Sequence, residues 1–175
     1  MANDKWYMLT LIGKDRPGIV AHITSALYEG NCNLGETTMM RLGGNFSMMM
    51  MVQFNGNLHA LHEVIDNEAE SFDLHLHIDP IEGRLHDHLQ PDVRITVYGA
   101  DKAGIVAKVT GVLAEAGLHI LDLDSDVAGT DKEPIYIMHI EGHANEGVAA
   151  LISAIEIVKL EGVDISLEEI DTLIG

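Results

Sequence analysis

The sequence is poor in cysteine and in basic residues, and each scarcity excludes a class of protein. Its 175 residues include a single cysteine, Cys32, so no disulfide can form within the chain. A lone cysteine fits a reducing compartment, and we therefore expect a cytoplasmic protein. Lysine and arginine number 10 against 28 aspartates and glutamates, which gives a formal net charge of −18 at pH 7. This charge repels nucleic acid and anionic membranes, so direct binding to either is not expected.

Long apolar runs and the common catalytic motifs are also missing. The apolar segment 6–12 is too short to cross a membrane, and it lacks the cleavage site of a signal peptide. No serine, cysteine or histidine stands in a recognised nucleophile motif, and no glycine pattern of a phosphate or dinucleotide site is present. We therefore expect a protein that is not an enzyme and that carries no cofactor.

What the sequence does contain is an internal repeat. Residues 13–24 read GKDRPGIVAHIT and residues 99–110 read GADKAGIVAKVT, with the same offset at every matched position. Between the copies, residues 80–91 hold two prolines, a glycine and a charged, histidine-rich middle, which is typical of a linker. We therefore predict two domains, over residues 1–79 and 92–175, joined by the linker 80–91.

Hydrophobic periodicity predicts the same order of elements in both copies. In the first copy, the predicted strands are 6–12, 34–42, 45–54 and 74–78, with helices over 17–30 and from Asn57. In the second copy, the predicted strands are 93–98, 120–127, 135–140 and 163–168, with helices ending at Gly117 and beginning at Asn145. A βαββαβ unit with an antiparallel sheet and both helices on one face is the ferredoxin-like fold, of the α+β class.

The turn before the first helix is a candidate ligand site. Ile19 and Ile23 recur at helical spacing, Pro17 fits a first helical turn, and Asp15 can cap that turn. Gly18 leaves the backbone open to a ligand. The N–H groups at a helix start carry partial positive charge and can hold a carboxylate or a phosphate. The alternative is that Asp15 is only a helix cap and that no ligand binds there.

The segment 15–20 (DRPGIV), followed by 30–34 (GNCNL), resembles the ACT domain, a small-molecule sensing module with the ferredoxin-like fold. Two such domains in one chain look like the glycine cleavage system transcriptional repressor family. The resemblance implies that an amino acid, glycine or serine, binds where the helix-start turn of one unit faces the beginning of the second strand of another. The ligand-binding positions that it implies are Asp15, Gly18, Ile19, Asn33 and Leu34 in the first copy, and Asp101, Gly104, Ile105, His119 and Ile120 in the second.

The second copy departs from the family pattern at two positions. Ala103 stands where the first copy has Pro17, and His119 stands where it has Asn33, a residue that can equally serve a turn at a strand start. The second site is therefore expected to be weaker, to take another ligand or to be structural. Members of the family act by engaging a DNA-binding protein, so the resemblance implies a transcription factor as partner. The alternative is a regulatory subunit of an amino-acid biosynthetic enzyme.

Methionine dominates the third predicted strand of the first copy. Residues 46–52 read FSMMMMV, so apolar and polar side chains do not alternate, and both faces of the sheet carry methionine. One face must meet the helices, and an exposed apolar patch on the other usually marks a contact. We expect this strand to be buried between the copies or between the subunits of a homodimer. The alternative is a locally irregular strand.

One acidic pattern resembles a calcium loop. Asp122, Asp124, Asp126 and Glu133 have most of the spacing of an EF-hand, but its sixth position, which requires glycine, is Val127. The repeat also places this region on a strand, where alternate residues share an extended face instead of wrapping an ion. Calcium binding is therefore not expected.

Two His-x-His pairs are the other candidate metal ligands. They are His75 with His77, and His86 with His88, and zinc or nickel could use either pair. An open strand face explains the first pair and a solvated linker explains the second. No metal site is expected from either.

Overall fold

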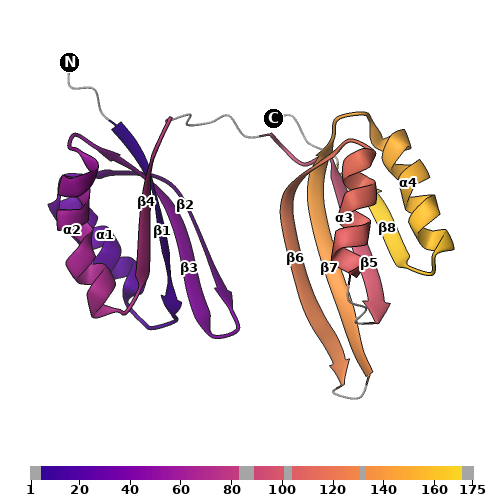
Figure 1. Ribbon diagram of the computed structural model, residues 1–175, viewed down its shortest axis with the longest axis horizontal. Coiled ribbons are helices and arrows are strands. Elements are labelled where there is room, and N and C mark those ends of the chain that lie inside the picture. Colours follow the sequence, from indigo (N-terminus) through magenta and orange to yellow (C-terminus); the bar gives the residue numbers. More distant parts are fainter. Residues whose placement is uncertain (1–4, 83–88, 101–103, 131–132, 171–175) are drawn as a thin grey trace. The chain divides into compact units, whose positions relative to one another are not determined.

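The computed structural model describes residues 5–82, 89–100, 104–130 and 133–170. The chain divides into two compact units, Met1–Asp87 and His88–Gly175, and each is described by itself. Both units have the predicted order of strand, helix, strand, strand, helix and strand (Figure 1). The limits of the predicted linker stay a prediction, because its middle lies outside the described residues.

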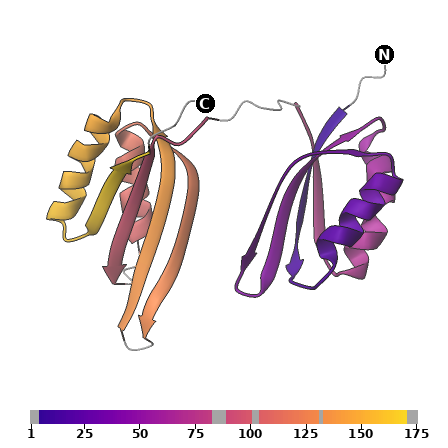
Figure 2. The ribbon, with the colours of Figure 1, turned by 180° about the vertical axis from the view of Figure 1, so that it is seen from behind.

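The first unit is a four-stranded antiparallel sheet with two helices on one face (Figures 1 and 2). Its elements are β1 (Lys5–Lys14), α1 (Ile19–Glu29), β2 (Asn33–Leu42), β3 (Asn45–Phe54), α2 (Leu58–Ser71) and β4 (His75–Ile81). The strand order is β2-β3-β1-β4. β2 and β3 form a hairpin through Gly43 and Gly44, whose φ angles of 56° and 78° lie in the left-handed region that glycine adopts without strain.

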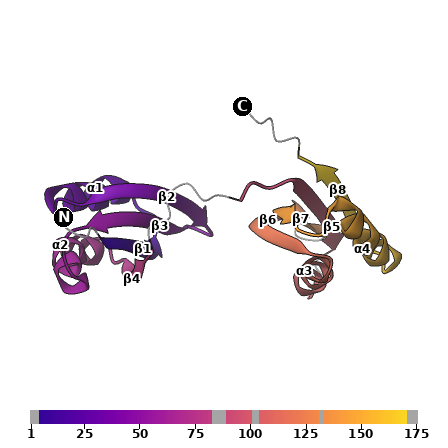
Figure 3. The same cartoon turned by 90° about the horizontal axis from the view of Figure 1, so that it is seen from above.

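The second unit repeats this architecture (Figure 3). Its elements are β5 (Val93–Ala100), α3 (Ile105–Glu115), β6 (Leu118–Thr130), β7 (Glu133–Ala144), α4 (Val148–Leu160) and β8 (Asp164–Glu169), and the strand order is β6-β7-β5-β8. β6 and β7 are longer than predicted, because their pairing continues to Thr130 and Glu133 through polar residues that are typical of a turn. No helix in the described part of the chain is both long and apolar enough to span a membrane.

Each unit has its own hydrophobic core between the sheet and the helices. In the first unit, the residues that alternate along β1 and recur along α1 are fully buried, namely Tyr7, Leu9, Leu11, Ile19, Ile23 and Leu27. In the second unit, the equivalent residues of β5 and α3 are buried, namely Val93, Ile95, Val97, Ile105, Val109 and Leu113. The predicted apolar faces are therefore confirmed, and the two units form the α+β fold that the sequence predicts.

The second helix of each unit begins in a different way. The Oδ1 of Asn57 accepts a hydrogen bond from the N–H of Ala60 at 2.9 Å, so Asn57 caps α2 as predicted. The N-cap of α4 is Gly147, with a φ of 86°, and no side chain caps this helix. The prediction that Asn145 caps the helix is therefore wrong, because the chain makes a further turn through a glycine before α4 begins.

β3 carries methionine on both faces of the sheet, as predicted. Met48 and Met50 are buried in the core beneath the helices, whereas Met49 is 43% exposed on the opposite face. Met51 lies on that opposite face too, paired in register with Met8 of β1. The pairing of β3 with β1 is unbroken from Asn45 to Phe54, so the strand is regular.

Candidate ligand site at the start of the first helix

Helix α1 begins without a side-chain cap. Its N-cap is Gly18, with a φ of 90° and a ψ of −9°. The first hydrogen bond of the helix runs from the N–H of His22 to the carbonyl of Gly18 at 3.0 Å, so the earlier N–H groups have no partner inside the helix. These groups carry the positive end of the helix dipole. Pro17 lies before the cap and not in the first helical turn as predicted, because the left-handed Gly18 separates it from the helix.

Asp15 does not cap the helix, which corrects the interpretation of the sequence. Its carboxylate forms an ion pair with the guanidinium of Arg41 on β2. Its N–H donates to the carbonyl of Gly44 in the hairpin at 3.1 Å. Asp15 comes before the N-cap position itself, so its side chain closes on the hairpin instead of the helix. These two contacts hold the turn against the β2–β3 hairpin.

An open hollow of about 300 Å³ lies on this turn. It is lined by Asp15, Arg16, Gly18, Ile19, Val20, Ala21, Met39 and Phe46. Three of the predicted site residues, Asp15, Gly18 and Ile19, therefore lie together. Sequence reasoning missed Arg16, which stands inside the repeated motif and could have been found there. It also missed Met39 and Phe46, which only the folded hairpin brings to the helix start.

The hollow combines apolar walls with Arg16 and with Asp15, whose carboxylate is paired with Arg41. Arg16 is exposed, and the uncapped N–H groups of α1 add partial positive charge beside it. Phe46 and Ile19 are each 2% exposed and form the buried part of the wall, whereas Met39 is 47% exposed. The volume lies at the lower end of the range for ligand sites. Such a hollow can hold the carboxylate of a small molecule against the backbone N–H groups.

Asn33 and Leu34 lie at the other end of the unit. Lys14 pairs with Asn45 at the end of β1 that leads to the turn, whereas Asn33 pairs with Gln53, which in turn pairs with Trp6 at the opposite end. The Nδ2–H of Asn33 donates to the Oε1 of Gln53 at 3.3 Å, and the Leu34 side chain is 45% exposed. One unit therefore does not bring these residues to the helix-start turn. Their contact with the turn of another unit stays a prediction.

The second unit repeats this separation. Gly104 is the N-cap of α3, with a φ of 95°, and its carbonyl accepts from the N–H of Lys108 at 2.9 Å. Ile105 is buried, as Ile19 is. Asp101 lies outside the described residues, so nothing is said of its place. His119 is exposed near the beginning of β6, opposite His143 of β7, and Ile120 follows it at the end of the unit away from Gly104.

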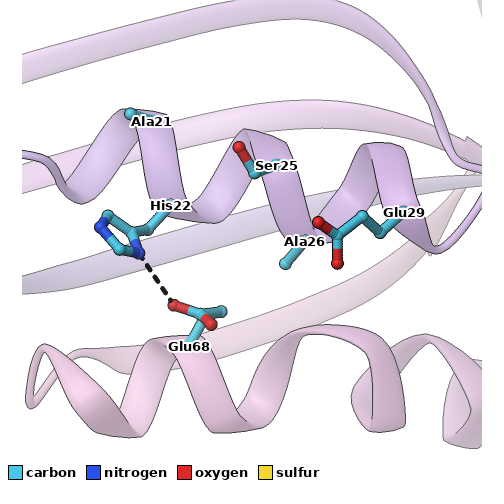
Figure 4. A pocket seen from close by; sticks show the side chains of 6 residues that line it. All are labelled: Ala21, His22, Ser25, Ala26, Glu29 and Glu68. Carbon is cyan, nitrogen blue, oxygen red and sulfur yellow. Dashed lines mark ion pairs between the residues drawn. The ribbon is translucent and has the colours of Figure 1, made fainter.

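A second hollow, of about 330 Å³, lies between α1 and α2 and has no signal in the sequence (Figure 4). Its lining residues are Ala21, His22, Ser25, Ala26, Glu29 and Glu68. The Nδ1 of His22 lies 3.5 Å from the Oε2 of Glu68, and its ring meets Phe72 edge-on at 5.2 Å. With two carboxylates in its lining, this hollow is less suited to a carboxylate ligand than the hollow at the turn is.

The metal patterns and the cysteine form no site in the described part of the chain, where no group of three or more possible ligands could hold a metal ion. His75 and His77 are exposed on β4, and the Nε2 of His77 lies 3.0 Å from the Oδ2 of Asp79. The second pair, His86 with His88, lies outside the described residues. The three aspartates of the calcium pattern lie on β6, along an extended strand. Cys32 is buried, and burial raises the pKa of its thiol, which opposes nucleophilic chemistry.

Comparison with known proteins agrees with the fold. The family model described as "ACT domain" matches the chain twice, over residues 7–79 and 92–166. The glycine cleavage system transcriptional repressors of Escherichia coli and Shigella flexneri are each 24% identical over 157 residues, which cover 89% of this chain and 83% of theirs. The crystal structure of an unknown protein from Galdieria sulphuraria is 26% identical, with a TM-score of 0.74 over 96% of this chain and 99% of that one.

Proposed function

The chain belongs to the ACT domain family, and we propose that it is a non-enzymatic regulatory protein that responds to an amino acid. The observation that supports this best is the uncapped start of α1, where Gly18 exposes backbone N–H groups beside Arg16. Such a turn binds a carboxylate without needing a lysine cluster, which this acidic chain does not have. A regulatory role of this kind requires no catalytic step.

We propose glycine or serine as the ligand. Its carboxylate would lie against the first N–H groups of α1, with the Arg16 guanidinium on the rim as a second donor. Asn33 of another unit would then complete the site, because its amide can both donate and accept hydrogen bonds. The second unit keeps the glycine turn but has His119 in place of this amide, so we assign it weaker binding or a structural role.

The response would pass to a partner protein and not directly to DNA. A formal net charge of −18 opposes contact with a nucleic acid backbone, whereas a DNA-binding protein presents basic surface that could attract it. The similar proteins of E. coli and S. flexneri are transcriptional repressors of the glycine cleavage system, which favours a regulator of glycine and one-carbon metabolism. The second candidate is a regulatory subunit of an amino-acid biosynthetic enzyme. Co-purification from native extract distinguishes a transcription factor from an enzyme.

A thermal-shift screen of the twenty amino acids tests the ligand. A ligand present at 100 times its Kd stabilises by about 2.7 kcal/mol. For a unit of this size that corresponds to a rise in Tm of roughly 10–20 °C. We expect glycine or serine to produce this rise and the other amino acids to produce little. If no amino acid raises the Tm, the proposed sensing function is wrong.

A pair of charge-reversal variants tests the place of binding. Arg16→Glu puts a carboxylate on the rim of the hollow and should weaken amino-acid binding about 10- to 100-fold in calorimetry, as the loss of a charge-assisted hydrogen bond predicts. Lys159→Glu makes the same change of charge in the last turn of α4, a helix that contributes no residue to the proposed site, and should leave the affinity unchanged. Equal losses in the two variants would show an effect of overall charge and not of this site.

A further inference from the structure

Both helices that the structure describes in the first unit lie on one face of its sheet, so neither covers the other face. Side chains alternate across a strand, so the residues between the buried ones of β1 and β3 point to this second face. We call it the open face of sheet 1, and its apolar members are Trp6, Met8, Ile12, Met40, Leu42, Met49, Met51 and Ile81. Met40 is 60% exposed, Ile12 is 48% exposed and Met49 is 43% exposed, which is unusual for large apolar side chains gathered on one surface.

Trp6 lies within this face and forms part of it. A Cβ atom added to Gly35 of β2 would stand 2.9 Å from the Cζ3 of Trp6 and 3.1 Å from the Cβ of Met51. The indole therefore lies across the space that Gly35 leaves, beside Met51. Trp6 is the only tryptophan of the chain, so its fluorescence reports on the open face.

The open face of sheet 1 has little charge for so acidic a chain. Of the residues that β1, β3 and β4 place there, Asp79 is the one carboxylate, and its Oδ2 lies 3.0 Å from the Nε2 of His77. The corresponding face of the second unit is acidic. The strand pairing of the second unit places six carboxylates and one arginine, Arg94, on this face. The carboxylates belong to Asp122, Asp124, Asp126, Glu141, Asp164 and Glu168. Two chains of net charge −18 therefore repel each other least at sheet 1.

The size of the face matches what a stable contact needs. β1 and β3 are ten residues long. At about 3.4 Å per residue along a strand and about 4.8 Å between the four strands, the face measures roughly 650 Å². Two such faces together would bury about 1,300 Å², which lies within the range for specific protein interfaces.

We propose that the open face of sheet 1 binds the same face of a second copy of this chain. A two-fold axis makes such a contact self-complementary, because each patch meets its own equivalent. Methionine suits it, since its flexible thioether side chain fills the irregular gaps between two sheets. The proposal rests on this surface alone and does not depend on the identity of the ligand.

Sedimentation velocity of the full chain and of two variants tests the proposal. The wild type should sediment at twice the chain mass at tens of micromolar. Met49→Glu places a charge on each side of the two-fold contact and should weaken association by about 100-fold or more. Ile157→Glu is the matched control, because Ile157 is an apolar residue that is 58% exposed on α4, outside the open face of sheet 1. It should leave the dimer intact, and both variants should keep the circular dichroism of the wild type.

Fluorescence quenching by acrylamide completes the test. Dilution of the wild type below its dissociation constant should expose Trp6, whereas Met49→Glu should show the exposed Trp6 at every concentration. A dimer that survives Met49→Glu, or one that only Ile157→Glu dissociates, would overturn the proposal. So would a monomeric wild type whose Trp6 is shielded at every concentration, because another surface of the same chain would then cover the face. A monomer with exposed Trp6 would show that no second copy binds there.

Discussion

Gly104→Ala and Gly111→Ala make the same chemical change in one unit, and we expect them to alter stability in opposite directions. Gly104 has a φ of 95°, and an added Cβ would meet no atom of the described residues within 4 Å, so the opposition to the substitution comes from the backbone. A left-handed conformation costs an L residue about 1–2 kcal/mol. Reduced freedom of the unfolded chain offsets about 0.4–1 kcal/mol of that. The net effect should be a loss of about 1 kcal/mol in the free energy of unfolding.

Gly111 lies inside α3 and is exposed, and an added Cβ there also meets no atom within 4 Å. Alanine in a helix interior is about 0.8–1.0 kcal/mol more favourable than glycine, so Gly111→Ala should stabilise the unit. The two variants should therefore differ by about 2 kcal/mol. With a urea m-value of about 1–2 kcal/mol/M, their midpoints in circular dichroism should differ by about 1–2 M. A Gly104→Ala variant as stable as Gly111→Ala would refute the left-handed turn at the start of α3.

Three further predictions follow from caps, turns and burial. Gly18→Val should abolish amino-acid binding in calorimetry, whereas Gly104→Val should keep most of it. Both variants carry the same backbone strain, so strain alone cannot explain a difference between them. The reverse result would place the ligand site in the second unit. Asn57→Ala should lower the free energy of unfolding by about 1 kcal/mol in urea, whereas Asn145→Ala, which is not a cap, should change it by less than about 0.5 kcal/mol. Equal losses would contradict the cap assignment. Burial raises the pKa of the Cys32 thiol above its ordinary value, so the folded state favours the protonated form, and stability should fall as the pH rises through the range in which a free thiol ionises. Cys32→Ala should lack this fall, and identical pH profiles of unfolding would contradict it.

The sequence was sufficient for the fold because the fold depends on local patterns. Alternation along β1 and helical spacing along α1 each indicate one buried face. The second copy of the repeat shows the same hydrophobic pattern along β5 and α3. Asn57 and the Gly43–Gly44 pair act within a few residues of their own position, so their roles could be predicted as well.

The candidate site was only partly predictable because it depends on contacts between distant residues. Asp15 was predicted to cap α1, but its carboxylate meets Arg41, a partner that only the folded hairpin supplies. The same hairpin brings Met39 and Phe46 to the turn. Glycine is the clearest local signal for the site, since the sequence predicts an open backbone at Gly18 and the structure gives it a positive φ.

The positions of Gly18 and Asn33 link ligand binding to association. They lie at opposite ends of one unit, so a ligand that touches both must bridge two units. Binding and association would then strengthen each other by the same factor, because their coupling is reciprocal. The unit that supplies Asn33 to the site comes either from the same chain or from another copy, and Met49→Glu distinguishes the two cases. If that variant is monomeric and binds the amino acid with unchanged affinity, the two units of a single chain form the site. If its affinity falls with the loss of the dimer, the site lies between two copies, and ligand affinity should rise with protein concentration in the wild type.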